Sequence, residues 1–157
     1  MKLLYIILAG MAATAAMTAF LYLLSYITHR VMKVIRILGT MLTKRTQPDG
    51  SLSDTLSTKI IGTIAHYLIG VAFAFVYLAL WDSEVGLISA SWGLLFGLGH
   101  GILAMIAWYF FFLIHPNPPI IPLKTYLLSL ISAHVIYGLV LTYTFYILIK
   151  PDYDFWW

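Results

Sequence analysis

The sequence has no cysteine, few charged residues and no proline inside its long apolar segments. Without cysteine the chain cannot form a disulfide and offers no thiol nucleophile, iron–sulfur ligand or cysteine-based zinc site. Only 10% of the 157 residues are charged and 62% are hydrophobic, whereas a soluble domain is about half apolar and about a quarter charged. These shortages exclude an ordinary soluble domain and predict a membrane protein.

Four apolar segments are long enough to cross a bilayer, which takes about 20 residues. We predict an all-α fold, a single integral membrane domain over residues 1–157 built as a bundle of four transmembrane helices. The spans cover about 3–28, 60–81, 85–114 and 125–149, and none of them contains Asp, Glu, Lys or Arg. The first span also fits a signal peptide that starts at Lys2, but its apolar run continues to Ile27, which favours an uncleaved helix.

The basic residues predict the orientation of the chain. Two connections carry most of them, namely the one between spans one and two and the one between spans three and four: Arg30, Lys33, Arg36, Lys44, Arg45, Lys59 and Lys124. The opposite side has only Lys2 and Lys150. Because cytoplasmic loops are rich in Lys and Arg, we expect both connections in the cytoplasm and both termini in the periplasm.

The segment after the first span alternates cations with apolar residues. Arg30, Lys33 and Arg36 recur at every third position, so a helix over 30–38 would separate a basic face from an apolar one. Such helices lie at membrane surfaces with their cations on lipid phosphates. We therefore predict a short interfacial basic helix that contacts lipid or another anionic group; docking of a partner is the alternative.

Small residues recur at helical spacing in the spans. Their four-residue steps predict close packing between helices, through Gly62, Gly70, Gly93, Gly97, Gly101 and Gly138. His66 and His134 fall on these stripes, and His100 lies beside one. The same faces that pack together should therefore carry the histidines toward the inside of the bundle.

These three histidines are the only residues in the spans that titrate near neutral pH. Ionisable residues inside membranes mark functional sites by default, and three interpretations remain open. The histidines form structural hydrogen bonds between helices, which is the favoured interpretation. Alternatively, His66 and His134, with His100 as a further candidate, ligate haem b, whose propionates would meet Arg30, Lys33 or Arg36. A bare metal ion on three histidines is disfavoured, because no carboxylate would balance its charge.

The sequence lacks the residues that several other functional classes require. The spans hold no carboxylate for proton or sodium transport and no Ser-His-Asp group, and no phosphate-binding loop or dinucleotide fingerprint is present. Topology explains the net charge of +3, so no nucleic-acid partner is expected. We expect a non-enzymatic protein, an accessory or oligomeric component of a membrane assembly. A small-solute transporter or channel that works as an oligomer is a second alternative to the haem-binding electron-transfer subunit.

Several short motifs appear in order along the chain. They are GxAATxAMT over 10–18, HxxxGxxFAxxY over 66–77, GxxFG over 93–97 with Ala104-Met105, and HxxYG over 134–138. In these motifs the chain resembles a group of uncharacterised, small four-helix bacterial inner-membrane proteins. It departs from that pattern at Thr142, where a glycine is expected. The resemblance implies a four-helix bundle in a bacterial inner membrane and implies no activity.

Overall fold

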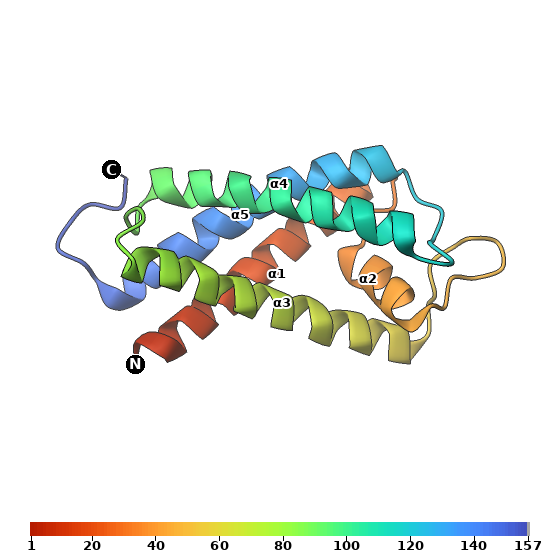
Figure 1. Ribbon diagram of the computed structural model, residues 1–157, viewed down its shortest axis with the longest axis horizontal. Helices are drawn as coiled ribbons and strands as arrows, with labels where there is room; N and C mark the ends of the chain where they lie inside the picture. The colour runs from red at the N-terminus through yellow and green to blue at the C-terminus, as the bar shows by residue number, and fades with distance from the viewer. Residues whose placement is uncertain (157) are drawn as a thin grey trace.

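The computed structural model describes residues 1–156 and shows five α-helices and no strand within them. The helices are α1 (Lys2–Thr28), α2 (Val34–Thr43), α3 (Leu56–Asp82), α4 (Ala90–Ile114) and α5 (Leu123–Ile149). The predicted all-α fold is confirmed, and α1, α3, α4 and α5 are each long and apolar enough to cross a membrane. The N-terminus lies at one end of the bundle together with the α3–α4 turn, and α2 lies at the other end (Figure 1). We call these the terminal end and the α2 end.

Two helix starts differ from the sequence prediction for local reasons. α3 begins at Leu56 rather than near residue 60, because the Thr55 side chain accepts a hydrogen bond from the Thr58 amide and caps a longer helix. α4 begins at Ala90 rather than near residue 85. Glu84 and Gly86 both have positive φ values, 62° and 80°, so the chain turns there before the helix can start.

The short helix between the first two spans is present, but it begins at Val34 instead of Arg30. α1 ends at Thr28, its C-cap residue His29 has a left-handed φ of 52°, and the Ser25 hydroxyl donates to the Arg30 carbonyl at 2.6 Å. These features turn the chain, so residues 30–33 form a link rather than a first helical turn. α2 then folds back against α3, and its buried positions include Ile37 and Met41.

α2 and α3 approach closely through a pair of glycines. A Cβ on Gly62 would lie 3.0 Å from the Gly39 Cα, and a Cβ on Gly39 would strike the Thr58 carbonyl oxygen. The predicted packing role of Gly62 therefore involves the short helix, not another span. As a result, α2 packs into one end of the bundle, and α3 covers one side of it.

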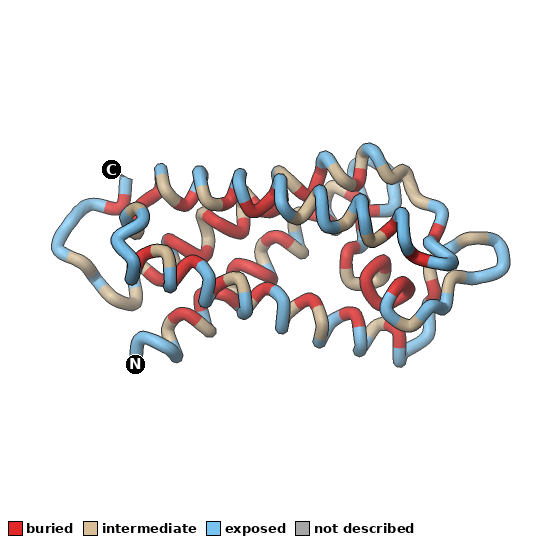
Figure 2. The backbone as a smooth tube through the Cα atoms, viewed as in Figure 1, coloured by how far each residue is buried: buried red, intermediate tan, exposed pale blue. Residues whose placement is uncertain are grey.

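α5 is the central helix of the bundle. It packs along both α4 and α1, and α1 in turn packs along α3. Of the four long helices α5 is the most buried and α4 the least, which the colouring by burial reflects (Figure 2). α3 and α4 are consecutive in the chain, but their backbones do not approach closely along their length; side chains such as Phe73 of α3 and His100 of α4 meet between them.

Glycines mediate the α4–α5 contact. A Cβ on Gly97 would lie 2.7 Å from the His134 carbonyl oxygen, and one on Gly101 would lie 2.8 Å from the Ile131 Cα. Gly93 faces Thr142, the residue where the resemblance leads one to expect glycine. The small-residue stripes of the sequence thus lie where two backbones come close together.

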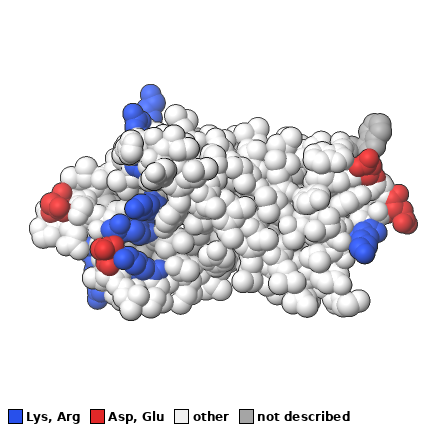
Figure 3. Space-filling view, turned by 180° about the vertical axis from the view of Figure 1, so that it is seen from behind, with Lys and Arg blue, Asp and Glu red and all other residues white. Residues whose placement is uncertain are grey.

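Charged side chains lie at the two ends of the bundle, as the view from behind shows (Figure 3). At the terminal end Lys2 forms an ion pair with Asp82. At the α2 end Asp54 pairs with Arg36 at 3.2 Å and with Lys59 at 2.9 Å. The middle of the surface in this view is uncharged, which is the distribution that a spanning bundle requires.

Candidate functional site

A cavity of about 570 Å³ lies within the bundle and is lined by residues from all five helices. Three of the five histidines line it, namely His66 of α3, His100 of α4 and His134 of α5. Each of them is 7–8% exposed. The histidines that the sequence placed on inward faces are therefore gathered around one space, which we call the bundle cavity.

His66 is tied to α1 by a hydrogen bond. Its Nε2 lies 2.9 Å from the Thr18 hydroxyl oxygen, while that hydroxyl donates its proton to the Thr14 carbonyl at 2.7 Å. Since a threonine hydroxyl has only one proton, we assign the shared bond to donation from His66 Nε2 to Thr18. His66 matches the structural interpretation, in which a neutral imidazole joins two helices.

His134 is held within its own helix. Its Nδ1 lies 2.7 Å from the Leu130 carbonyl oxygen, which can only accept. The imidazole therefore carries its proton on Nδ1, and Nε2 keeps its lone pair. His134 thus presents a fixed hydrogen-bond acceptor at the wall of the bundle cavity.

His100 has no hydrogen bond within the part of the chain that the structure describes, and its Nδ1 is buried without a partner. Its ring stacks on Phe73 with centroids 3.9 Å apart and contacts the His134 ring at 4.5 Å. Orphaned buried N–H groups are rarer than orphaned acceptors. We therefore assign the proton of His100 to Nε2, which leaves Nδ1 as the unpartnered acceptor.

Together His100 and His134 form a donor beside an acceptor in an apolar space. The rest of the lining is aliphatic or aromatic and includes Leu38, Leu103, Trp108 and Phe111. Buried polar groups in native proteins are nearly always hydrogen-bonded, so His100, which has no partner among the described residues, marks with the adjacent His134 a place where a further group can bind.

Two tyrosines border the histidine pair. The Tyr137 hydroxyl donates to the Gly70 carbonyl at 2.6 Å and so joins α5 to α3 across the cavity. The Tyr77 hydroxyl is buried and has no hydrogen-bond partner within residues 1–156. The ring of Tyr77 lies 6.1 Å from that of His100. Two side chains that each have an unpartnered buried polar atom are therefore neighbours.

Metal binding has little support in this arrangement. Among residues 1–156, no group of three or more His, Asp or Glu side chains is placed to hold a metal ion. This gives no support to the three-histidine metal site considered from the sequence, although all three imidazoles line the same cavity.

The cavity also lacks most of what haem b requires. His134 has one suitable feature, because a carbonyl bond at Nδ1 is typical of metal-ligating histidines. However, His66 Nε2 is engaged by Thr18, and the rings of His100 and His134 touch each other. The cavity lining includes no Lys or Arg for the propionates. The residues present do not fit haem.

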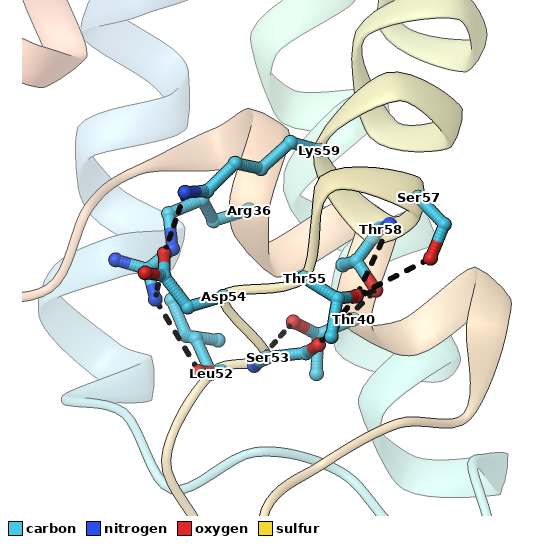
Figure 4. Close-up of polar contacts among 9 residues, drawn as sticks. All are labelled: Arg36, Thr40, Leu52, Ser53, Asp54, Thr55, Ser57, Thr58 and Lys59. Carbon is cyan, nitrogen blue, oxygen red and sulfur yellow. Dashed lines mark hydrogen bonds and ion pairs between the residues drawn. The ribbon is translucent and has the colours of Figure 1, made fainter.

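Arg30, Lys33 and Arg36 lie elsewhere, around a second pocket at the α2 end that shares no lining residue with the bundle cavity. Arg30 donates to the Thr125 hydroxyl at 2.7 Å. Arg36 contacts Asp54, which lies between Arg36 and Lys59 (Figure 4). The hydrogen bond from Lys59, followed by the charge of Arg36, holds the pKa of Asp54 below its usual value, so this carboxylate is ionised at neutral pH.

Replacing Thr18 with valine is expected to lower the free energy of unfolding by about 1 kcal/mol, because it removes the hydrogen bond to His66. The matched control is Thr63→Val in α3, since Thr63 donates only to the Lys59 carbonyl of its own helix. Unfolding of both variants by denaturing detergent, followed by circular dichroism, measures the difference. Equal stability of the two variants would mean that the hydrogen bond between α1 and α3 does not stabilise the fold.

Several lining residues were not identified from the sequence as site residues. Leu38 and Leu42 of α2 belong to the cavity wall because α2 folds back into the bundle. Phe73, Trp108 and Phe111 also line the cavity and were not predicted as site residues. One signal was available: His100, Ala104 and Trp108 follow each other at four-residue spacing, which puts them on one face of a helix.

No protein-family model, curated protein or solved structure matches this chain. Function is therefore inferred from the geometry of the site.

Proposed function

We propose that the protein is a non-enzymatic membrane protein that binds a lipophilic ring compound carrying a hydroxyl or carbonyl oxygen, the chemistry of membrane quinols and quinones. The observation that carries the proposal is the contact in the bundle cavity between His100, which has no hydrogen-bond partner among the described residues, and the ring of His134. A ligand hydroxyl can accept from His100 Nε2 and donate to His134 Nε2. An aromatic ring of such a ligand matches the aromatic lining.

The position of the cavity supports a ligand that comes from the lipid phase. Ile69 of α3 and Leu103 of α4 line the cavity and are still 48% and 61% exposed. They lie on α3 and α4, whose backbones do not approach closely along their length. Since both helices are long and apolar enough to face hydrocarbon, a ligand that passes between them needs no route through water.

Chemical analysis of the purified protein tests this proposal. The protein is extracted in a mild detergent and examined by visible spectroscopy and by mass spectrometry of an organic-solvent extract. We expect one lipophilic ring compound with hydroxyl or carbonyl oxygens, in an amount that falls in His100→Leu. An intense Soret band would support haem instead, and a ligand that persists equally in His100→Leu would contradict the assigned site.

We also propose a bacterial inner-membrane location with both termini in the periplasm and the α2 end in the cytoplasm. The clustering of Lys and Arg at the α2 end supports this orientation, and the motif resemblance supports the type of membrane. An oligomeric or accessory role in a larger membrane assembly is compatible with ligand binding and stays part of the proposal.

Single cysteines can test the orientation because the chain has none of its own. Ser51→Cys at the α2 end is expected to resist a membrane-impermeant maleimide added to intact spheroplasts, and Ser83→Cys at the terminal end to react. Both residues are exposed and lie outside the helices or at their caps, so the pair is matched for access. The opposite labelling pattern would mean that the protein is inserted the other way round.

A further inference from the structure

The second pocket, at the α2 end, has a volume of about 540 Å³ and a different chemistry from the bundle cavity. It lies where α1 stops and the chain turns toward α2. Its lining includes the tyrosines Tyr22 and Tyr26 of the last turns of α1, followed by Arg30, Lys33 and Arg36. Three cations therefore surround one hollow next to the apolar surface of a long helix. We call this hollow the basic pocket.

The positive charge of the basic pocket is only partly balanced. Asp54 is the carboxylate that pairs with Arg36, and it also pairs with Lys59. The side chain of Lys33 makes no hydrogen bond or ion pair within the described residues, although it lies near enough to Asp54 to influence its pKa. Since one carboxylate serves several cations, the pocket keeps an excess of positive charge that favours an anion.

The two arginines are held in place by neighbouring groups. Arg36 donates from Nη2 to the Leu52 carbonyl at 3.3 Å, in addition to its pair with Asp54, and Arg30 donates from Nη1 to Thr125. The Nε of Arg36 is buried and has no partner among residues 1–156. A fixed guanidinium with an unused N–H is suited to phosphate, which accepts several hydrogen bonds at once.

We propose that the basic pocket binds the phosphate-bearing headgroup of an anionic membrane lipid. Tyr22 lies within α1, one of the helices long and apolar enough to span a membrane, and Val31 and Leu52 add apolar lining beside the cations. A free phosphate would use the cations only. A lipid would also use the apolar surface for its acyl chains. This proposal does not depend on the ligand of the bundle cavity.

Native mass spectrometry of the delipidated, detergent-solubilised protein tests the proposal. The probes are phosphatidylglycerol and phosphatidylcholine with identical acyl chains, and inorganic phosphate as a separate competitor. We expect the protein to retain phosphatidylglycerol in preference to phosphatidylcholine. Lys33→Glu should lower the apparent affinity for phosphatidylglycerol by about tenfold, because it reverses one charge of the pocket, and Lys33→Gln should have a smaller effect.

Lys44 provides the matched control. It is exposed at the same end of the bundle but does not line the basic pocket, so Lys44→Glu changes the net charge equally and should alter the affinity less than about twofold. Lys33 makes no bond that its replacement would break, so both variants should fold. Equal losses in the Lys33 and Lys44 variants, no preference for phosphatidylglycerol, or displacement of the lipid by millimolar inorganic phosphate would each overturn the assignment to a lipid headgroup.

Discussion

Alanine at Gly138 is expected to lower the free energy of unfolding by about 1–3 kcal/mol, the usual range for overpacking a tight contact. A Cβ on Gly138 would lie 2.7 Å from the Gly97 Cα and 2.9 Å from the Gly97 nitrogen. Both atoms belong to the α4 backbone, so no side-chain rotation can relieve the contact. The two helices must move apart to make room.

The effect should be large because α4 depends on this contact. α5 is the long helix along which α4 packs, and α4 supplies one wall of the bundle cavity. Separation of α4 from α5 would therefore weaken both the fold and the site. Unfolding in mixed micelles of mild and denaturing detergent, followed by circular dichroism, measures the loss.

Gly99 provides the matched control for Gly138. It lies on the same helix pair, but a Cβ there would meet no atom within 4 Å. Gly99→Ala should leave the stability unchanged or raise it, since alanine is the better helix former by up to about 1 kcal/mol. If Gly99→Ala and Gly138→Ala were equally destabilising, general glycine flexibility rather than close packing would explain the role of these residues.

Leucine at His100 is expected to raise stability while it weakens ligand binding by about tenfold or more. His100 has a buried Nδ1 without a partner, and an unsatisfied buried group costs about 1–3 kcal/mol. Leucine has no polar side-chain atom, so it removes that cost. It also removes the Nε2–H that we assign as the donor to the ligand oxygen.

His66 and His100 should behave in opposite ways. His66→Leu breaks the bond to Thr18, so it should destabilise the protein, with a weaker effect on binding. Binding is measured by equilibrium dialysis of a decyl-tailed benzoquinol against each detergent-solubilised variant, and stability by unfolding of the same samples. A His100→Leu protein that is less stable than wild type and binds the probe normally would assign His100 to the structural interpretation.

The sequence was sufficient to predict four long apolar helices and the buried faces that carry three of the histidines. Both follow from composition and spacing, since apolar runs mark helices that can cross a bilayer and glycine stripes mark the faces that pack. The position of α2 was not predictable in the same way. Arg30, Lys33 and Arg36 suggested a helix that starts at Arg30, but a left-handed His29 and the bond from Ser25 turn the chain first.

The contacts that the histidines make could not be predicted from the sequence either. His66 and His134 were the first candidates for a ligand pair, but the structure places His100 against His134 and His66 against Thr18. These contacts depend on the rotation of each helix about its axis and on the separation of α3 from α4. A pattern along one helix predicts its buried face, but not which residue of another helix will meet it.

The most direct test of the central claim is to fill the bundle cavity and measure binding of the decyl-tailed benzoquinol. Ala104 lines the cavity, whereas Ile106 lies on the same helix, is 44% exposed and does not line it. If the cavity is the binding site, Ala104→Phe should weaken binding by about tenfold or more, since each 1.4 kcal/mol lost is a factor of ten, and Ile106→Phe by less than about twofold. Unchanged binding in a folded Ala104→Phe protein would contradict the claim.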